Sequence, residues 1–235
     1  MAKQFQEIKA VISGDVISST SLVEEDRVEL EKRMAWLLGF LEDKFGVFGR
    51  IIKGDYLECV VGNPANALRV ALAIKSFVKA FEVQSSKNSK INNRIKLFKT
   101  HGIRLAVGLG ELSRFDPDKG IIDGEAVYLS GRLINVAHSH NKERVVIKST
   151  LFFASSSEAL NEQFQAMFAL LDELISKATA RQSEVLFWKL MGENESEIAE
   201  RLDISQSVVN QHSTSLGWNG IEKAVDYFNK TIQEK

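Results

Sequence analysis

The sequence has little cysteine: Cys59 is the single one among 235 residues. One cysteine excludes a disulfide framework and is typical of a protein in the reducing cytoplasm. No apolar run approaches the ~20 residues that span a bilayer, and the first residues lack the apolar stretch of a signal peptide. The net charge is −1, which argues against a chain that coats nucleic acid or anionic membrane non-specifically. We therefore expect a cytoplasmic protein without membrane contact.

The remaining composition is that of an ordinary globular protein. Hydrophobic residues make up 44% of the chain and charged residues 26%, which excludes wholesale disorder. There is no internal repeat and no low-complexity tract. The length suits one and a half or two domains.

The first 150 residues alternate between strand and helix patterns. Apolar runs and turn signals predict strands at residues 8–13, 47–52, 56–61, 103–109 and 144–147. Helical spacing predicts helices at residues 24–45, after Pro64 and at 124–138. The polar, basic stretch 84–100 predicts a loop. This order predicts an α+β domain, with helices packed on a mixed or antiparallel sheet.

Two aspartates stand at the ends of predicted strands. Asp15 follows the first strand, and Asp55 lies at the tip of the hairpin formed by residues 47–61. If that strand lies beside the hairpin, both carboxylates meet at one edge of the sheet. Two carboxylates together with the phosphates of a nucleotide commonly hold Mg²⁺, and paired ions can promote phosphoryl transfer. Each aspartate also follows a glycine, which is ordinary turn chemistry, so both interpretations stay open.

Four segments resemble the motifs of class III nucleotide cyclases, in the same order along the chain. They are residues 15–20, 54–56, 102–110 and 124–133. The resemblance implies a ferredoxin-like, nucleotide-cyclase-type domain. It also implies that Asp15 and Asp55 bind Mg²⁺ or Mn²⁺ and that Arg132 contacts phosphate.

The sequence departs from that family where the substrate is recognised. Tyr128 stands in place of the ribose-binding asparagine, and Ile51 and Ile121 replace the base-reading lysine and aspartate. Two isoleucines cannot make the hydrogen bonds of that pair, so selective cyclisation of ATP or GTP is not expected. Binding without turnover stays open, with Lys53 and Arg132 as the candidate phosphate-binding residues.

The last part of the chain, residues 179–235, has helical patterns throughout. A short helix at 196–202, a connection at 203–205 and a helix at 206–216 resemble the helix-turn-helix of LuxR-type and sigma-factor-like regulators. Asparagine and glutamine can bind adenine, and serine or histidine can reach base edges or phosphate. The candidate DNA-binding residues are Ser205, Gln206, Ser207, Asn210, Gln211 and His212.

The charge of this region argues against DNA binding. Residues 179–235 contain six basic and nine acidic residues, and the second helix of the motif has no lysine or arginine. Because phosphate neutralisation supplies most of the affinity for DNA, the same helices could instead serve packing or protein contact.

Over nearly the whole chain, this combination of segments resembles the SatD family of bacterial proteins. We expect a cyclase-like domain at residues 1–153, a connecting helix at 154–178 and a helix-turn-helix domain at 179–235. The resulting hypothesis is a homodimeric, DNA-binding transcription regulator whose degenerate cyclase-like domain binds a metal with a nucleotide or phosphate effector. The alternatives are a divergent metal-dependent nucleotidyl cyclase or phosphoryl-transfer enzyme, and a protein-interaction module with a vestigial pocket.

Overall fold

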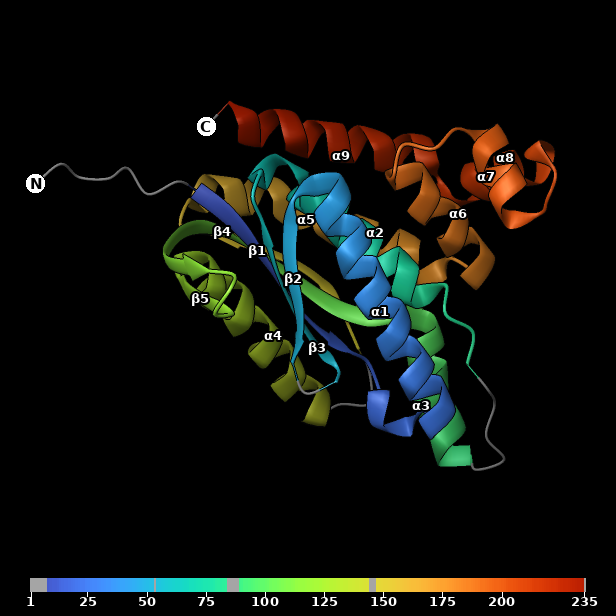
Figure 1. Cartoon of the computed structure of the whole chain (residues 1–235), viewed down its shortest axis with the longest axis horizontal. Coiled ribbons are helices and arrows are strands. Elements are labelled where there is room, and N and C mark those ends of the chain that lie inside the picture. The colour runs from blue at the N-terminus through green and yellow to red at the C-terminus, as the bar shows by residue number, and fades with distance from the viewer. Residues whose placement is uncertain (1–7, 53, 84–88, 144–146, 235) are drawn as a thin grey trace, which may run out of the picture.

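A six-stranded sheet forms the centre of the molecule (Figure 1). The computed structural model describes residues 8–52, 54–83, 89–143 and 147–234. The strands in these residues are β1 (Ile8–Val16), β2 (Val47–Ile52), β3 (Tyr56–Val61), β4 (Ile103–Asp116), β5 (Ile121–Gly124) and β6 (Leu151–Ser155).

The order of the strands is ferredoxin-like. β2, β3, β1 and β4 lie side by side, and each neighbouring pair is antiparallel. Helices connect β1 to β2 and β3 to β4, as in the βαββαβ arrangement. β6 pairs in parallel with the first half of β4, and β5 pairs with the second half. The α+β prediction with a ferredoxin-like sheet is confirmed.

Helices cover both faces of this sheet and continue beyond it. Those in the described residues are η1 (Ser19–Ser21), α1 (Glu24–Phe45), η2 (Pro64–Asn66), α2 (Ala67–Lys79), α3 (Ser89–His101), α4 (Glu125–Glu143), α5 (Glu158–Lys177), α6 (Ala180–Leu190), α7 (Glu195–Leu202), α8 (Gln206–Leu216) and α9 (Trp218–Gln233). None of the helices within these residues is long and apolar enough to cross a membrane.

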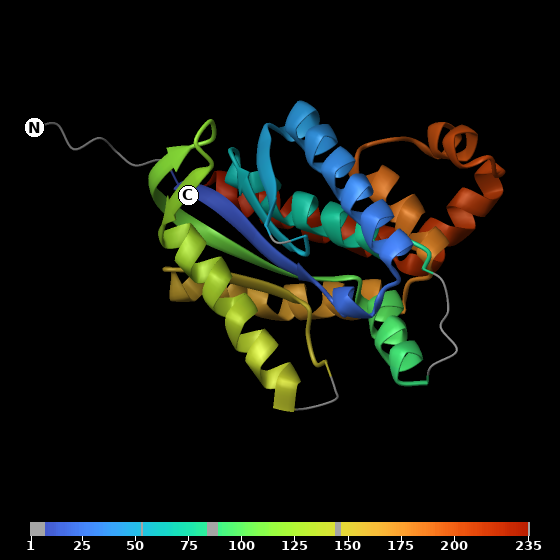
Figure 2. The same ribbon diagram turned by 60° about the horizontal axis from the view of Figure 1, so that its bottom comes forward.

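Side chains along β1 point alternately to the two faces of the sheet, so they contribute to two separate core clusters. Ile12 belongs to the main core with α1 and α2, whereas the neighbouring Val11 packs with Ala126 of α4. Figure 2 shows the sheet between these two layers. α4 comes so close to β4 that a Cβ added at Gly108 would lie 2.2 Å from the carbonyl oxygen of Ala126. Only glycine permits that approach.

The main core continues from the sheet into the C-terminal helices. Phe187 and Leu190 of α6 belong to it together with the buried residues of α2. Phe228 of α9 lies with its ring centroid 4.8 Å from that of Phe164 in α5. The predicted division into residues 1–153, 154–178 and 179–235 stays a prediction, and packing across its boundaries is extensive.

Several predicted elements differ from the structure. The stretch 84–100 was expected to be a loop, but α3 occupies most of it because Ile91, Ile95 and Phe98 form an apolar stripe at helical spacing. The final strand was expected at residues 144–147, whereas β6 begins at Leu151. Residues 144–146 lie outside the described residues. The predicted hairpin of β2 and β3 is confirmed, with Gly54 at a φ of 81° in its turn.

Candidate functional site

Asp15 lies near the end of β1, between two strands that supply its neighbours. It is paired with Tyr56 of β3 on one side and with Arg104 of β4 on the other. The Arg104 Nη1 donates to both carboxylate oxygens of Asp15, at 3.1 and 3.0 Å. The arginine side chain is 4% exposed and the aspartate side chain 20%. A nearly buried cation therefore already neutralises the Asp15 carboxylate.

A polar strip continues from Asp15 across the same face of the sheet. The Ser13 and Ser130 hydroxyls lie 2.8 Å apart, joining β1 to α4. Further along, the Arg50 Nε donates to Glu58 Oε2 at 2.9 Å, joining β2 to β3. Burial raises the pKa of Tyr56, and a hydrogen bond with Ser13 partly opposes that effect. This strip is made of internal ion pairs and hydrogen bonds between neighbouring strands and from β1 to α4.

Asp55 lies in the β2–β3 turn and is held from a different direction. The Ser19 Oγ donates to Asp55 Oδ2 at 2.8 Å, and the Asp55 carbonyl accepts from the Val16 amide at 3.0 Å. Asp55 lines a cavity of about 220 Å³ together with Glu31 of α1 and Thr20 of η1. The main chain of Asp55 is thus tied to the end of β1, while its carboxylate faces η1.

Each of the two carboxylates already has a hydrogen-bond partner in this arrangement. Among the described residues, no three histidine, cysteine, aspartate or glutamate side chains are grouped so that they could hold a metal ion. A cation bound at Asp15 would lie beside the nearly buried guanidinium of Arg104, whose positive charge opposes it. The predicted site consists of two carboxylates completed by phosphate oxygens, so a shared Mg²⁺ between Asp15 and Asp55 stays a prediction.

The residues predicted to recognise a nucleotide lie on α4 and on the β2–β3 hairpin. Arg132 is exposed on α4. Lys53 lies outside the described residues. Tyr128 is exposed and donates to Asp123, and this hydrogen bond raises the pKa of Tyr128. Ile51 is partly buried and packs against the main core, so its position has an apolar rather than a base-reading environment.

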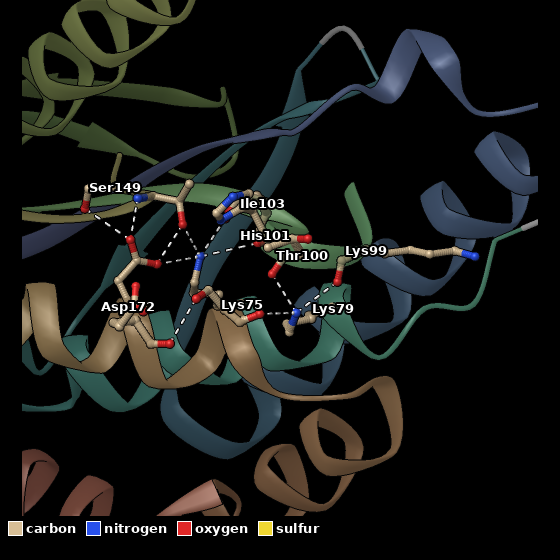
Figure 3. Close-up of polar contacts among 11 residues, drawn as sticks. Lys75, Lys79, Lys99, Thr100, His101, Ile103, Ser149 and Asp172 are labelled. Carbon is tan, nitrogen blue, oxygen red and sulfur yellow. Dashed lines mark hydrogen bonds and ion pairs between the residues drawn. The ribbon is translucent and has the colours of Figure 1, made fainter. Parts of the chain in front are cut away.

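A buried cluster of charges lies between α2 and α5, and the sequence analysis missed it (Figure 3). Lys75 of α2 is 0% exposed, and its Nζ lies 3.1 Å from Asp172 Oδ1 of α5. The Nζ also donates to Thr150 Oγ1 at 2.6 Å and to the Ile103 carbonyl at 3.1 Å. The Thr150 hydroxyl in turn donates to Asp172 at 2.7 Å. The cluster therefore connects α2, β4, α5 and the residue before β6.

The pKa values of the groups in this cluster are shifted by burial and by the charges of their neighbours. Burial lowers the pKa of Lys75, and Asp172 opposes that effect. For Asp172, burial is outweighed by Lys75 and by hydrogen bonds from Thr150, so the pKa of this carboxyl is lowered. Burial and the nearby Lys75 lower the pKa of Lys79 to about 8. Burial, followed by the charge of Lys75, lowers the pKa of His101 to about 4.

The cluster has the contacts of a structural clamp. The Lys79 Nζ donates to the carbonyls of Lys99 and Thr100, at 2.9 and 2.6 Å, near the end of α3. These bonds satisfy carbonyls that the helix itself leaves without partners. The sequence contained one signal for this cluster. Lys75 and Lys79 stand in a helix whose sequence is mostly apolar, which favours burial of the helix and pairing of its lysines.

A second candidate site is formed by α7 and α8, which are joined by three residues. Asp203 in this turn is left-handed, with a φ of 51°, and the Ile204 amide donates to the Ala199 carbonyl at 3.1 Å. Ala199 and Val209 pack in a small core with Val185 of α6. A small side chain at position 199 lets the helices approach closely at the turn.

The opposite face of α8 is polar. Ser205, Gln206, Ser207, Asn210 and Gln211 are exposed, and His212 is half-buried. Ser205 caps the helix, because its Oγ accepts from the Val208 amide. Asn210 donates to Glu195 at 3.3 Å. Most of the predicted DNA-binding residues therefore share one accessible surface.

The cations around this surface are engaged by acids. Arg201 of α7 is paired with Glu193 at 2.6 Å, and Lys189 of α6 is paired with Glu195 at 3.3 Å. The Arg201 guanidinium also lies 4.0 Å from the ring centroid of Trp188. These ion pairs limit how far either side chain can contact an external phosphate.

Comparisons with known proteins find similar solved structures only. No protein-family model and no curated protein matches the sequence. A bacterial light-regulated adenylyl cyclase is 19% identical over 68% of this chain and 79% of its own, with a TM-score of 0.43. The adenylyl cyclase CyaB from P. aeruginosa is 16% identical over 58% of this chain and 80% of its own, with a TM-score of 0.37.

A third similar structure is the guanylyl cyclase domain of the RhoGC fusion protein from Blastocladiella emersonii. It is 17% identical over 57% of this chain and 76% of its own, with a TM-score of 0.40. The chain is thus similar to adenylyl and guanylyl cyclase domains. At these identities and scores, we infer function from the residues of this chain alone.

Proposed function

We propose that this chain is a DNA-binding regulator in which α7 and α8 form a helix-turn-helix and α8 reads bases in the major groove. The geometry of the turn carries the proposal. Ala199 packs with Val209 in the small core, Asp203 is left-handed, and Val209 is fully buried on the inner face of α8. This packing holds α8 by one face and leaves its other face to solvent, as a reading helix requires.

The exposed side chains of α8 have the chemistry to distinguish bases. The amides of Asn210 and Gln211 can each make two hydrogen bonds to adenine, and Gln206 lies one turn before Asn210 on the same face. Ser205, Ser207 and His212 can contact phosphates or base edges. Asn210 must exchange its bond to Glu195 for a bond to a base, which lowers the net gain.

A single copy provides few phosphate contacts, because its nearest cations are paired with acids. We therefore propose that the chain binds as a homodimer. Two copies would double the number of contacts and would place two α8 helices on half-sites one helical turn of DNA apart. The expected operator is accordingly a palindrome.

The cyclase-like part is proposed to bind a nucleotide or phosphate effector without turning it over. Arg104 holds Asp15, while apolar residues stand where a base would be read. Both features oppose catalysis. Asp15 and Asp55 remain the predicted ligands of Mg²⁺ or Mn²⁺, and Arg132 and Lys53 the predicted phosphate contacts. The alternatives remain a divergent metal-dependent cyclase or phosphoryl-transfer enzyme, and a protein-interaction module.

Retention of genomic fragments by the full chain tests DNA reading. Fragments retained by the wild type are sequenced and compared with those retained by the triple variant Ser207→Ala, Asn210→Ala, Gln211→Ala. A matched control carries Gln165→Ala, Asn219→Ala and Gln233→Ala, which also removes three exposed neutral side chains. We expect a common palindrome from the wild type and the control and none from the α8 variant. Equal recovery by all three proteins would reject the proposal.

Two assays separate the effector from the enzyme alternative. Thermal unfolding with Mg²⁺ or Mn²⁺ and each nucleoside triphosphate should reveal a ligand, because one present at a hundred times its Kd adds about 2.7 kcal/mol of stability. Turnover of the same nucleotides is expected to be absent. Mn²⁺-dependent product that disappears in both Asp15→Asn and Asp55→Asn would establish the enzyme alternative instead.

A further inference from the structure

A cavity of about 370 Å³ opens between α1, α2 and α6, on the opposite layer from Asp15 and its polar strip. Its size is within the range of small-molecule sites. The side chains that matter for its chemistry are Arg33, Trp36, Phe77, Glu184, Phe187 and Trp188.

Four aromatic rings line the cavity, those of Trp36, Phe77, Phe187 and Trp188. Trp36 is 50% exposed, and its ring is stacked on Phe77 with centroids 5.5 Å apart and planes 20° apart. Trp188 presents an edge to Trp36 at 6.5 Å. Trp36 is also stacked on Phe40, with centroids 5.2 Å apart and planes 15° apart. The half of the indole that remains exposed offers an apolar surface against which a further planar ring can pack.

The charge at the rim favours an anion. Glu29 and Glu184 are the acids and Lys32 and Arg33 the bases, but Glu184 already accepts a hydrogen bond from Arg181 at 2.7 Å. The Arg33 guanidinium lies over the rings of Phe77 and Phe81, at 5.2 and 5.5 Å. Within the described residues no carboxylate is paired with Arg33. Its N–H groups are therefore available to an acidic ligand.

We propose that this cavity binds a planar aromatic ring that carries a carboxylate or phosphate. The ring packs against the exposed part of Trp36 and against Trp188, and the acidic group accepts hydrogen bonds from Arg33 and attracts Lys32. This inference is independent of DNA binding, because every contact lies on α1, α2 and α6.

One wall of the cavity reaches the helices of the candidate DNA site. Trp188 packs against the main core and against the small core of Val185, Ala199 and Val209. It also lies under the guanidinium of Arg201 in α7. A ligand that moves Trp188 would therefore change its contacts with α7. That regulatory consequence alone rests on the proposed function.

The three tryptophans of the chain provide the test. The full chain, with ¹⁵N in its indoles, is titrated with 2-naphthoate, and the uncharged 2-naphthamide serves as the comparison. We expect saturable shifts of the Trp36 and Trp188 indole signals. The Trp218 signal should stay in place, because that ring lies outside the cavity lining, 5.9 Å from Lys189 Nζ.

A charge variant then tests the role of Arg33. Arg33→Gln should weaken 2-naphthoate about tenfold, the loss of one charge-assisted contact, and leave 2-naphthamide unchanged. Arg114→Gln, an exposed arginine of β4, is the matched control and should affect neither probe.

Three results would overturn the proposal. One is the absence of any shift at millimolar 2-naphthoate. Another is equal affinity of the wild type and Arg33→Gln for this probe. The third is movement of the Trp36 and Trp188 signals on dilution without any probe, which would show that a second copy covers the cavity. None of these results depends on whether the protein retains DNA.

Discussion

Removing the buried ammonium of Lys75 should destabilise the protein strongly. Lys75 is 0% exposed at its side chain and its partner Asp172 8%, with 3.1 Å between Nζ and Oδ1. Breaking a buried ion pair typically costs about 3–5 kcal/mol, because the remaining charge is left in a medium of low polarity. After Lys75→Met, Asp172 still accepts hydrogen bonds from Ser149 and Thr150. We therefore expect the lower end of that range, about 3 kcal/mol.

The assay is urea unfolding at pH 7, followed by circular dichroism and tryptophan fluorescence. Coincident transitions from both probes would justify a single free energy of unfolding. The double variant Lys75→Met, Asp172→Asn removes both charges and keeps an acceptor for the Thr150 amide. It should therefore be more stable than Lys75→Met alone.

Two results would refute this reasoning. A loss below about 1 kcal/mol in Lys75→Met would mean that the ammonium is not holding a buried carboxylate, since losses of that size are usual for exposed pairs. A double variant with a lower free energy of unfolding than Lys75→Met would mean that the carboxylate of Asp172 is not destabilising when the ammonium of Lys75 is absent.

Three further perturbations follow from particular contacts. The pKa of His101 is about 4 in the folded chain and about 6.5 when unfolded. The stability that the neutral imidazole contributes is therefore fully present above pH 6.5 and is lost as the pH falls towards 4. In His101→Gln, the free energy of unfolding should depend less steeply on pH over this range. Gly108→Ala forces a Cβ against the Ala126 carbonyl and should lower the urea midpoint by the equivalent of about 1–3 kcal/mol, which an unchanged midpoint would contradict. Asp203→Gly removes the backbone strain of a left-handed residue, so the free energy of unfolding should rise by up to ~1 kcal/mol and the thermal midpoint with it. Asp203→Val should lower the thermal midpoint.

Local patterns were sufficient for the elements of the sheet. The β2–β3 hairpin follows from two apolar runs around Gly54, whose positive φ the turn requires. α1 follows from its helical spacing and ends at Gly46, a left-handed cap. These features depend on residues close together in the chain, so they could be predicted without knowledge of the fold.

Contacts between distant residues could not be predicted in the same way. Arg104 reaches Asp15 only because β4 pairs with β1 in one particular register. The mostly apolar sequence of α2 indicates that Lys75 is buried, but no local pattern identifies Asp172, about a hundred residues away, as its partner. The stretch that contains α3 was predicted as a loop because its polar, basic composition obscured the apolar stripe of Ile95 and Phe98.

The division between the two parts of the chain illustrates the same limit. A change from mixed to purely helical patterns after residue 178 suggested a separate domain. In the structure, Phe187 of α6 lies with its ring centroid 5.0 Å from that of Phe77 in α2, so the C-terminal helices share the core of the sheet. Amphipathic patterns show that a helix has an apolar face but do not show what covers it.

Photocrosslinking from α8 tests the central claim most directly. A benzophenone side chain is placed at Ser207 in one variant and at Gln165, an exposed residue of α5, in another. Each full-length variant is irradiated with genomic DNA fragments. The account predicts DNA adducts from position 207 and none above background from position 165. Equal yields from both positions, or no adduct from position 207, would contradict it.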